Sequence, residues 1–169
     1  MNEINTSRLK LLELGHQQLQ LCLFDLSEFE EQTNIKIAPD FITSRVQRAI
    51  RMKVKKMQQA KPSYHAWLTY WLVVIRDENI GAGMLGFKGY PNAEGSTEIG
   101  YGIDPAYQNN GYMSEAVQAL IEWAFSHPFC RTITATEVYN PASRRLLEKL
   151  GAIQTEDNKK FTSWEIRKI

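Results

Sequence analysis

Residues 98–116 read Glu98-Ile99-Gly100-Tyr101-Gly102-Ile103-Asp104-Pro105-Ala106-Tyr107-Gln108-Asn109-Asn110-Gly111-Tyr112-Met113-Ser114-Glu115-Ala116. Apolar and aromatic residues at the start of this stretch predict a strand over 97–103. Apolar residues at helical spacing after the turn predict a helix over 111–125. The first N–H groups of a helix lack internal partners, and the helix dipole adds partial positive charge there. The turn is therefore interpreted either as a simple tight turn or as a site for an anion such as pyrophosphate.

Further strands and helices are expected on both sides of this unit. The expected strands span 8–14, 70–76, 80–88, 97–103, 132–138 and 161–169. The expected helices span 16–31, 42–57, 111–125 and the stretch from Asn140-Pro141 to Gly151. Three consecutive strands indicate an antiparallel meander, and the strand–helix–strand that follows indicates a parallel pair. The predicted fold class is α/β, with a mixed, mostly antiparallel central sheet of six to seven strands flanked by about four helices.

Length and composition fit one domain over residues 1–169. The 20 basic and 19 acidic residues give a net charge of +1, which argues against a dedicated nucleic-acid binder. Two distant cysteines exclude a disulfide scaffold, and three scattered histidines show no zinc spacing, so no metal is expected. The longest apolar run, 67–75, is shorter than the roughly 20 residues of a membrane span, and residues 1–5 show no signal pattern. We expect a cytoplasmic protein with neither a nucleic-acid nor a membrane partner.

The stretch Gly81-Ala82-Gly83-Met84-Leu85-Gly86 matches the G-x-G-x-x-G pattern of dinucleotide-binding proteins. That pattern requires a helix starting within it and an acidic residue about 20 positions on. Here Pro91 follows closely and Ala106 stands where the acid is expected. We interpret the glycines as strand positions where another chain or ligand packs closely.

Two motifs carry a resemblance to a known family. Residues 108–113 (Gln108-Asn109-Asn110-Gly111-Tyr112-Met113) resemble the Q/R-x-x-G-x-G/A turn of the GNAT N-acetyltransferase superfamily, although Met113 departs from the usual Gly or Ala. Residues 140–152, which begin Asn140-Pro141-Ala142-Ser143, are similar to the family's N-x-x-S/A helix. Arg8-Leu9-Lys10-Leu11 resembles the opening strand of the branch that contains ribosomal-protein alanine N-acetyltransferases. The resemblance covers nearly the whole chain and is strongest over 98–152.

This resemblance implies that acetyl-CoA binds as a co-substrate between the strands over 97–103 and 132–138. Its pyrophosphate would lie in the turn over 108–113, while Ile103 and Asn140 would contact the pantetheine arm from opposite sides. Asn140 also fits a helix N-cap, and both roles are expected. The implied cofactor-binding residues are Ile103, Gln108, Asn109, Asn110, Gly111, Tyr112, Met113, Asn140 and Ser143.

The implied reaction is direct attack of a primary amine on the acetyl group. Glu98 matches a glutamate that acts as the base in some family members. The alternative interpretation is that Glu98 is simply a carboxylate at a sheet edge. Ser143 matches a serine that lies near the CoA sulfur in the family. The alternative interpretation is that Ser143 is an ordinary residue of the first helical turn. The family's tyrosine acid is replaced by Leu147, which leaves Tyr101 and Tyr139 as further candidates. The alternative function is a non-catalytic acyl-CoA-binding or regulatory member of the family.

The acceptor is not identified by the sequence. Residues 14–64 correspond to the family's variable acceptor side, and protein N-termini, small amines and antibiotics stay open, as does a homodimer. The acidic stretch over 25–31 is interpreted as a solvated face rather than as a site that attracts a cationic amine. The segment over 45–61 forms a basic helix, which either faces an acidic partner or pairs with the acidic stretch. The aromatic residues over 64–71 are interpreted as core and strand positions.

Overall fold

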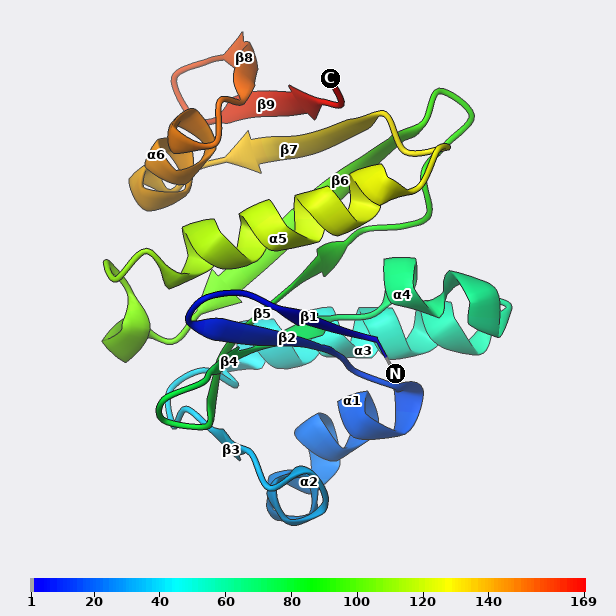
Figure 1. Ribbon diagram of the computed structural model, residues 1–169, viewed down its shortest axis with the longest axis vertical. Coiled ribbons are helices and arrows are strands. Elements are labelled where there is room, and N and C mark those ends of the chain that lie inside the picture. Colours follow the sequence, from blue (N-terminus) through cyan, green and yellow to red (C-terminus); the bar gives the residue numbers. More distant parts are fainter. Residues whose placement is uncertain (1) are drawn as a thin grey trace.

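The computed structural model describes residues 2–169, which form one nine-stranded sheet with helices on both faces (Figure 1). The strands are β1 (Glu3–Asn5), β2 (Leu9–Glu13), β3 (Lys36–Ile37), β4 (Trp71–Ile75), β5 (Ile80–Phe87), β6 (Ser96–Ile103), β7 (Thr132–Val138), β8 (Ile153–Asp157) and β9 (Thr162–Arg167). The helices are α1 (His16–Phe24), α2 (Leu26–Thr33), α3 (Ser44–Gln58), α4 (His65–Leu68), α5 (Tyr112–Ser126) and α6 (Pro141–Lys149). The strand order is β1-β2-β4-β5-β6-β7-β9-β8, with β3 beside β5.

The mixed, mostly antiparallel sheet confirms the predicted fold class. β4, β5 and β6 form the predicted antiparallel meander, and β6 runs parallel to β7 after the α5 crossover. The strand and helix numbers are higher than predicted. β1, β3 and α4 are too short to produce a periodic pattern, β8 is exposed at every position, and one predicted helix is two helices.

The helix predicted over 16–31 is wrong as a single element. It is divided at Asp25, whose backbone leaves the helical region (φ −153°) and whose carboxylate accepts a hydrogen bond from Glu28 N at 3.1 Å. Asp25 is thus the N-cap of a second helix, a role that aspartate favours.

Alternating strand positions build a core on each face of the sheet. In β4, Trp71, Val73 and Ile75 belong to the core beneath α4, α5 and α6, whereas Leu72 and Val74 belong to the core beneath α1, α2 and α3. This follows from the two-residue period of a strand. The two helical layers therefore cover opposite faces of the sheet.

The glycine-rich stretch lies entirely within β5, and no helix follows it, as expected. A Cβ at Gly83 would lie 2.5 Å from the carbonyl oxygen of Gly102, and one at Gly86 would lie 2.5 Å from that of Thr69. The glycines therefore permit close packing of neighbouring chain segments. Among residues 2–169, no helix combines the length and apolar composition needed to cross a membrane.

Candidate active site

β6 and β7 separate after a short paired segment. They pair only between Ser96–Glu98 and Thr132–Thr134. β7 then carries a bulge between Ala135 and Val138, where Glu137 has a φ of +51°, and it continues beside β9 rather than β6. A bulge bends its strand away from a neighbour. The second half of β6 therefore has one hydrogen-bonding edge that no strand covers.

The register of β6 determines which residues use this open edge. Lys88 N donates to Glu98 O and Asp104 N donates to Ala82 O, both at 2.7 Å. Because antiparallel pairing alternates, residues 98, 100, 102 and 104 bond to β5. The backbone groups of Ile99, Tyr101 and Ile103 consequently face the open edge.

The turn between β6 and α5 leaves a row of backbone donors uncovered. Asn109 has a φ of +61° and Gly111 a φ of +77°, and α5 begins at Tyr112. Within residues 2–169, no hydrogen-bond acceptor engages the backbone N–H groups of residues 109–114. Six consecutive donors at a helix N-terminus form a site suited to a phosphate group.

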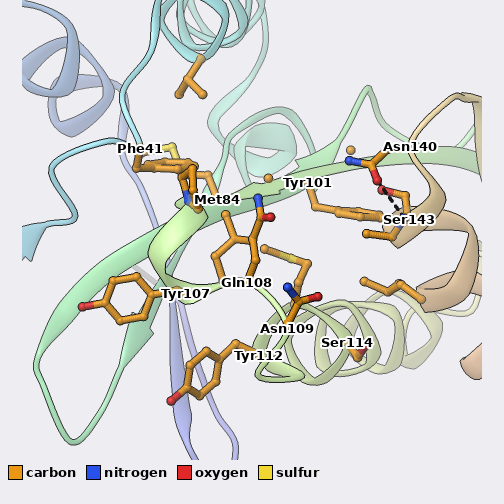
Figure 2. Close-up of a pocket in the computed structure, with 18 of the residues that line it drawn as sticks. Phe41, Met84, Tyr101, Tyr107, Gln108, Asn109, Tyr112, Ser114, Asn140 and Ser143 are labelled. Carbon is orange, nitrogen blue, oxygen red and sulfur yellow. Dashed lines mark hydrogen bonds between the residues drawn. The ribbon is translucent and has the colours of Figure 1, made fainter.

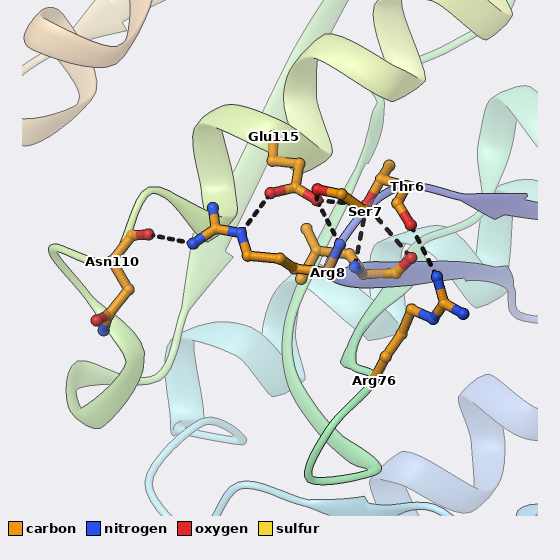
Figure 3. A network of polar contacts seen from close by, with 7 residues as sticks. Thr6, Ser7, Arg8, Arg76, Asn110 and Glu115 are labelled. Atoms are coloured by element: carbon orange, nitrogen blue, oxygen red, sulfur yellow. Dashed lines mark hydrogen bonds and ion pairs between the residues drawn. The ribbon is translucent and has the colours of Figure 1, made fainter.

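Arg8 and Glu115 fasten this turn to the β1–β2 connection (Figure 3). Arg8 Nη1 donates to Asn110 O at 2.8 Å, and its Nε pairs with Glu115 Oε2 at 2.7 Å. The guanidinium also lies 4.7 Å from the ring centre of Tyr112. Although burial opposes the shift, hydrogen bonds from Thr6 and Arg8 hold the pKa of Glu115 below its usual value. A charged pair therefore fixes the turn from outside.

The first turn of α6 faces the open edge of β6. Asn140 is the N-cap of α6, since its Oδ1 accepts from Ala142 N at 2.8 Å, which confirms the capping prediction. Its amide nitrogen donates to no acceptor within residues 2–169. Ser143 lies one turn into the helix beside Tyr101 (Figure 2). Burial raises the pKa of Tyr101, and its interaction with Ser143 acts in the opposite direction.

One cavity of about 730 Å³ joins these features. It brings together eight of the predicted site residues (Figure 2). They are Ile103, Gln108, Asn109, Gly111, Tyr112, Met113, Asn140 and Ser143. Arg145 and Lys149 of α6 add positive charge to the same lining. We call this side of the cavity the loop wall, and its lining residues come from the segments 100–114 and 140–149.

Three predicted candidates lie outside the cavity lining. The Asn110 side chain bonds back to Tyr107 O and Gln108 O at 3.3 and 3.0 Å. The Glu98 carboxylate forms an ion pair with Lys88 and accepts from Thr136 Oγ1 at 2.6 Å. Tyr139 is 59% exposed and packs against Phe161. The role of Glu98 as a base stays a prediction, and its carboxylate is already engaged.

The opposite side of the cavity was missed by the sequence analysis. We call it the α3 wall, and it consists of Asp40, Phe41, Thr43, Arg45, Val46, Ala49, Tyr70 and Met84. These residues come from three separate segments with no shared motif. Tyr70, predicted to be a core and strand residue only, is one of them, whereas Trp67 and Trp71 are core residues as predicted.

The basic helix α3 does not pair with the acidic stretch. Within the part of the chain that the structure describes, no ion pair joins α3 to residues 25–31, so one of the two predicted arrangements is wrong. Lys53 is instead buried beneath the α3 wall, where it donates to Phe87 O and lies 4.9 Å from the ring centre of Tyr70. Burial lowers the pKa of Lys53 to about 7, and Lys56 and Lys88 act in the same direction.

Comparisons with known proteins agree with this geometry. The family model described as the acetyltransferase (GNAT) domain matches residues 24–153. The uncharacterized N-acetyltransferase YjdG of Bacillus subtilis (strain 168) is 37% identical over 95 residues, which cover 56% of each chain. The matched part thus spans about half the length of the curated relatives.

Solved structures share the fold over nearly their whole length. A ribosomal-protein-S5-alanine acetyltransferase from Vibrio fischeri has a TM-score of 0.67 at 17% identity, covering 99% of this chain and 97% of its own. RimL, a ribosomal L7/L12 α-N-protein acetyltransferase solved in complex with coenzyme A, has a TM-score of 0.65 at 19% identity, covering 98% of both chains. With a family model matched over most of its length and this fold, the chain belongs to the GNAT acetyltransferase family.

Proposed function

We propose that this protein transfers the acetyl group of acetyl-CoA to a primary amine by direct attack. One observation carries the proposal: the open edge of β6 and the uncovered N–H groups of residues 109–114 line the same cavity. A strand edge suits the amide-containing pantetheine arm, and the row of donors suits the pyrophosphate. The structure of RimL with coenzyme A, which has the same fold, supports this choice of cofactor.

The residues present fit acetyl-CoA along its length. The backbone groups of Tyr101 and Ile103 would pair with the pantetheine arm on one side, and the free amide nitrogen of Asn140 would reach it from the other. Gln108 to Met113 would surround the pyrophosphate, and Arg145 and Lys149 would add charge near its phosphates. Met113 is 8% exposed and packs into the core, so the departure from Gly or Ala leaves the loop donors uncovered.

The bound co-substrate supplies an activated acetyl thioester. The amine nitrogen forms a bond to the carbonyl carbon and loses a proton to water, the carbon–sulfur bond breaks, and the departing sulfur takes up a proton. We assign delivery of that proton to the Ser143 hydroxyl, with Tyr101 beside it as the group that resupplies it. Leu147 is 1% exposed within the core, so the family's usual acid position offers no proton here.

The environment of Glu98 favours an acceptor that needs little help to lose its proton. An α-amino group has a pKa of about 7.7–8.0, whereas a lysine amine has one near 10.4 and requires a base at neutral pH. The Glu98 carboxylate is held by Lys88 and Thr136. We therefore propose an α-amine, on a protein N-terminus or a small molecule, as the acceptor.

The test is release of free coenzyme A thiol from acetyl-CoA with a panel of amines. Short peptides with free N-termini, matched peptides with blocked N-termini and one lysine, and small amines form the panel. The proposal expects turnover with free α-amines and little with lysine side chains at pH 7.5. Tight acetyl-CoA binding without turnover on any amine would instead support the non-catalytic, acyl-CoA-binding alternative.

A further inference from the structure

Asp104 directly follows β6 and is the most completely buried acidic residue among residues 2–169, at 1% exposed. Its two carboxylate oxygens accept from different segments. Oδ2 accepts from Asp40 N at 2.9 Å, and Oδ1 accepts from Ala106 N at 2.8 Å. No cation pairs with it within the described part of the chain. Two backbone N–H groups are thus the hydrogen-bond partners of this buried carboxylate. A buried carboxylate without such partners would destabilise the fold.

These two bonds join the opposite walls of the cavity. Asp40 begins the α3 wall and is followed directly by Phe41, which also lines the cavity. Ala106 belongs to the single helical turn over Pro105–Tyr107 that leads into Gln108 and the phosphate-binding turn. Asp104 is itself anchored to the sheet, since its backbone N donates to Ala82 O at 2.7 Å. The residue therefore connects sheet, loop wall and α3 wall at one point.

The hydrogen bond from Asp40 to Asp104 joins residues that are far apart in the sequence. Few other backbone hydrogen bonds connect this segment to the sheet. Residues 38–43 bond among themselves through Phe41 N to Ala38 O and Thr43 N to Phe41 O. Their other backbone tie to the sheet is Ala38 N to Gly81 O at 2.9 Å. Phe41 is also held by burial in the core, and Thr43 O accepts from Gln47 N of α3. The bond at Asp104 is the polar contact that joins this segment to the start of the loop wall.

We infer that Asp104 is a positioning residue that sets the distance between the acceptor on the α3 wall and the acetyl group on the loop wall. This inference rests on the proposed function. Direct transfer needs the reacting atoms about 3–3.5 Å apart, and a displacement near 1 Å can cost about 100-fold in rate. Asp104 does not touch the reacting atoms. It acts through the two backbone N–H groups that its carboxylate holds.

The inference is tested with Asp104→Asn and Asp104→Ala, measured at saturating acetyl-CoA and acceptor. Asparagine retains one acceptor oxygen and alanine retains none. We expect kcat to fall at least tenfold in Asp104→Asn and further in Asp104→Ala, while the Kd for acetyl-CoA changes less than threefold in Asp104→Asn. Thr97→Val is the matched control, because it removes another buried side-chain hydrogen bond (Thr97 Oγ1 to Gly89 O, 2.7 Å) away from the cavity.

A second pair of variants addresses the α3-wall bond alone. Asp40→Pro removes the N–H donor, whereas Asp40→Ala retains it, and the side chain at position 40 is exposed. Because position 40 follows Pro39 in a tight turn closed by Phe41 N to Ala38 O, where proline can disturb the turn, unfolding midpoints of both variants are measured first. We expect Asp40→Pro to have a kcat at least tenfold below that of Asp40→Ala. Equal kcat values in this pair, or a kcat for Asp104→Asn within twofold of the wild type, would overturn the inference, even where the unfolding midpoint falls.

Hydrogen exchange separates failure of this inference from failure of the proposed function. With acetyl-CoA bound, the amides of residues 38–41 are expected to exchange at least tenfold faster in Asp104→Ala than in the wild type. If the wild type binds acetyl-CoA and acetylates nothing, the proposed function fails and exchange alone decides the role of Asp104. Unchanged exchange in this segment would contradict the role, whatever the activity.

Discussion

The loop wall of the cavity presents backbone groups, whereas the α3 wall presents side chains. On the loop wall, the N–H groups of residues 109–114 and the open edge of β6 are the chemically active features. On the α3 wall, apolar residues such as Phe41, Val46 and Met84 lie beside Arg45 and Asp40. Backbone donors require only a particular chain path, while the shape and charge of the α3 wall depend on each side chain.

This difference separates the shared part of the chemistry from the specific part. A co-substrate bound through backbone groups can be retained while most side chains change, which fits a fold shared at under 20% identity. A wall of side chains can accept a different amine in each relative. We therefore propose that the loop wall carries the acetyl-CoA chemistry and that the α3 wall determines the acceptor.

The largest expected effect is at Ser143 on the loop wall. Ser143→Ala removes the hydroxyl assigned to the departing sulfur, and positioned acid–base groups contribute about 100-fold or more. We expect kcat to fall roughly 100-fold with the acetyl-CoA Kd unchanged, measured by steady-state kinetics and calorimetry. Ser126→Ala, an exposed position at the end of α5, is the control. An unchanged kcat would remove Ser143 from the mechanism and leave the loop wall a binding surface only.

A substitution at Gly111 tests whether the backbone conformation of the turn creates the acetyl-CoA site. Its φ of +77° costs other residues about 1–2 kcal/mol, and an added Cβ would lie 3.4 Å from Arg8 Nη2. Gly111→Val is expected to weaken acetyl-CoA binding at least tenfold in calorimetry.

Gly151 is a matched control for this substitution. It has a φ of +74° and no atom within 4 Å of an added Cβ, and it does not line the cavity. Gly151→Val should therefore lower the unfolding midpoint in a similar way without changing the acetyl-CoA Kd. Equal losses of affinity in both variants would show that strain, rather than the site, explains the effect.

Substitution of Arg8 is expected to have a smaller effect on acetyl-CoA binding, because Arg8 contacts the loop wall from outside the cavity. Arg8→Ala removes the bond to Asn110 O and the pair with Glu115. Since one hydrogen bond contributes about 0.5–1.5 kcal/mol net, acetyl-CoA should bind about two- to tenfold more weakly. Arg167→Ala, which breaks the exposed pair with Glu165 at 2.5 Å, should leave binding unchanged. Wild-type affinity in Arg8→Ala would show that the turn holds its shape alone.

Lys53 beneath the α3 wall gives the smallest effect, on stability rather than activity. Burial lowers the pKa of Lys53 to about 7 in the folded protein, against an ordinary value of 10.5, so between these pH values the unfolded chain binds more protons. Stability therefore rises with pH across this window, and the full penalty applies below pH 7. We expect Lys53→Met to flatten that rise in unfolding midpoints measured from pH 7 to 9.5. An identical pH profile in the variant would contradict this.

The local signals of the loop wall predicted its turn and its helix cap, and the family resemblance assigned them to a cofactor site. The turn over 108–113 and the cap at Asn140 lie within a few residues of the structure they form, so motif and geometry coincide. The break at Asp25 was also local: Asp25 followed by Glu28 is a cap pattern, and it was hidden by leucines at helical spacing on both sides.

The α3 wall could not be predicted because tertiary structure assembles it. Phe41, Tyr70 and Met84 meet through the pairing of β4 with β5 and the docking of α3, and no spacing in the chain indicates this. The surroundings of Glu98 were missed for a similar reason. Its partner Lys88 is a neighbour across the β5–β6 pairing, and the register of two strands decides which charges meet.

The central claim, that the loop wall binds acetyl-CoA, is tested most directly by thermal unfolding with acetyl-CoA, using NADH at equal concentration as the control. A ligand at 100 times its Kd adds about 2.7 kcal/mol, which raises the midpoint of a chain of this size by roughly 5–11 °C. We predict this shift with acetyl-CoA and none with NADH. No shift with acetyl-CoA, or an equal shift with both, would contradict the claim.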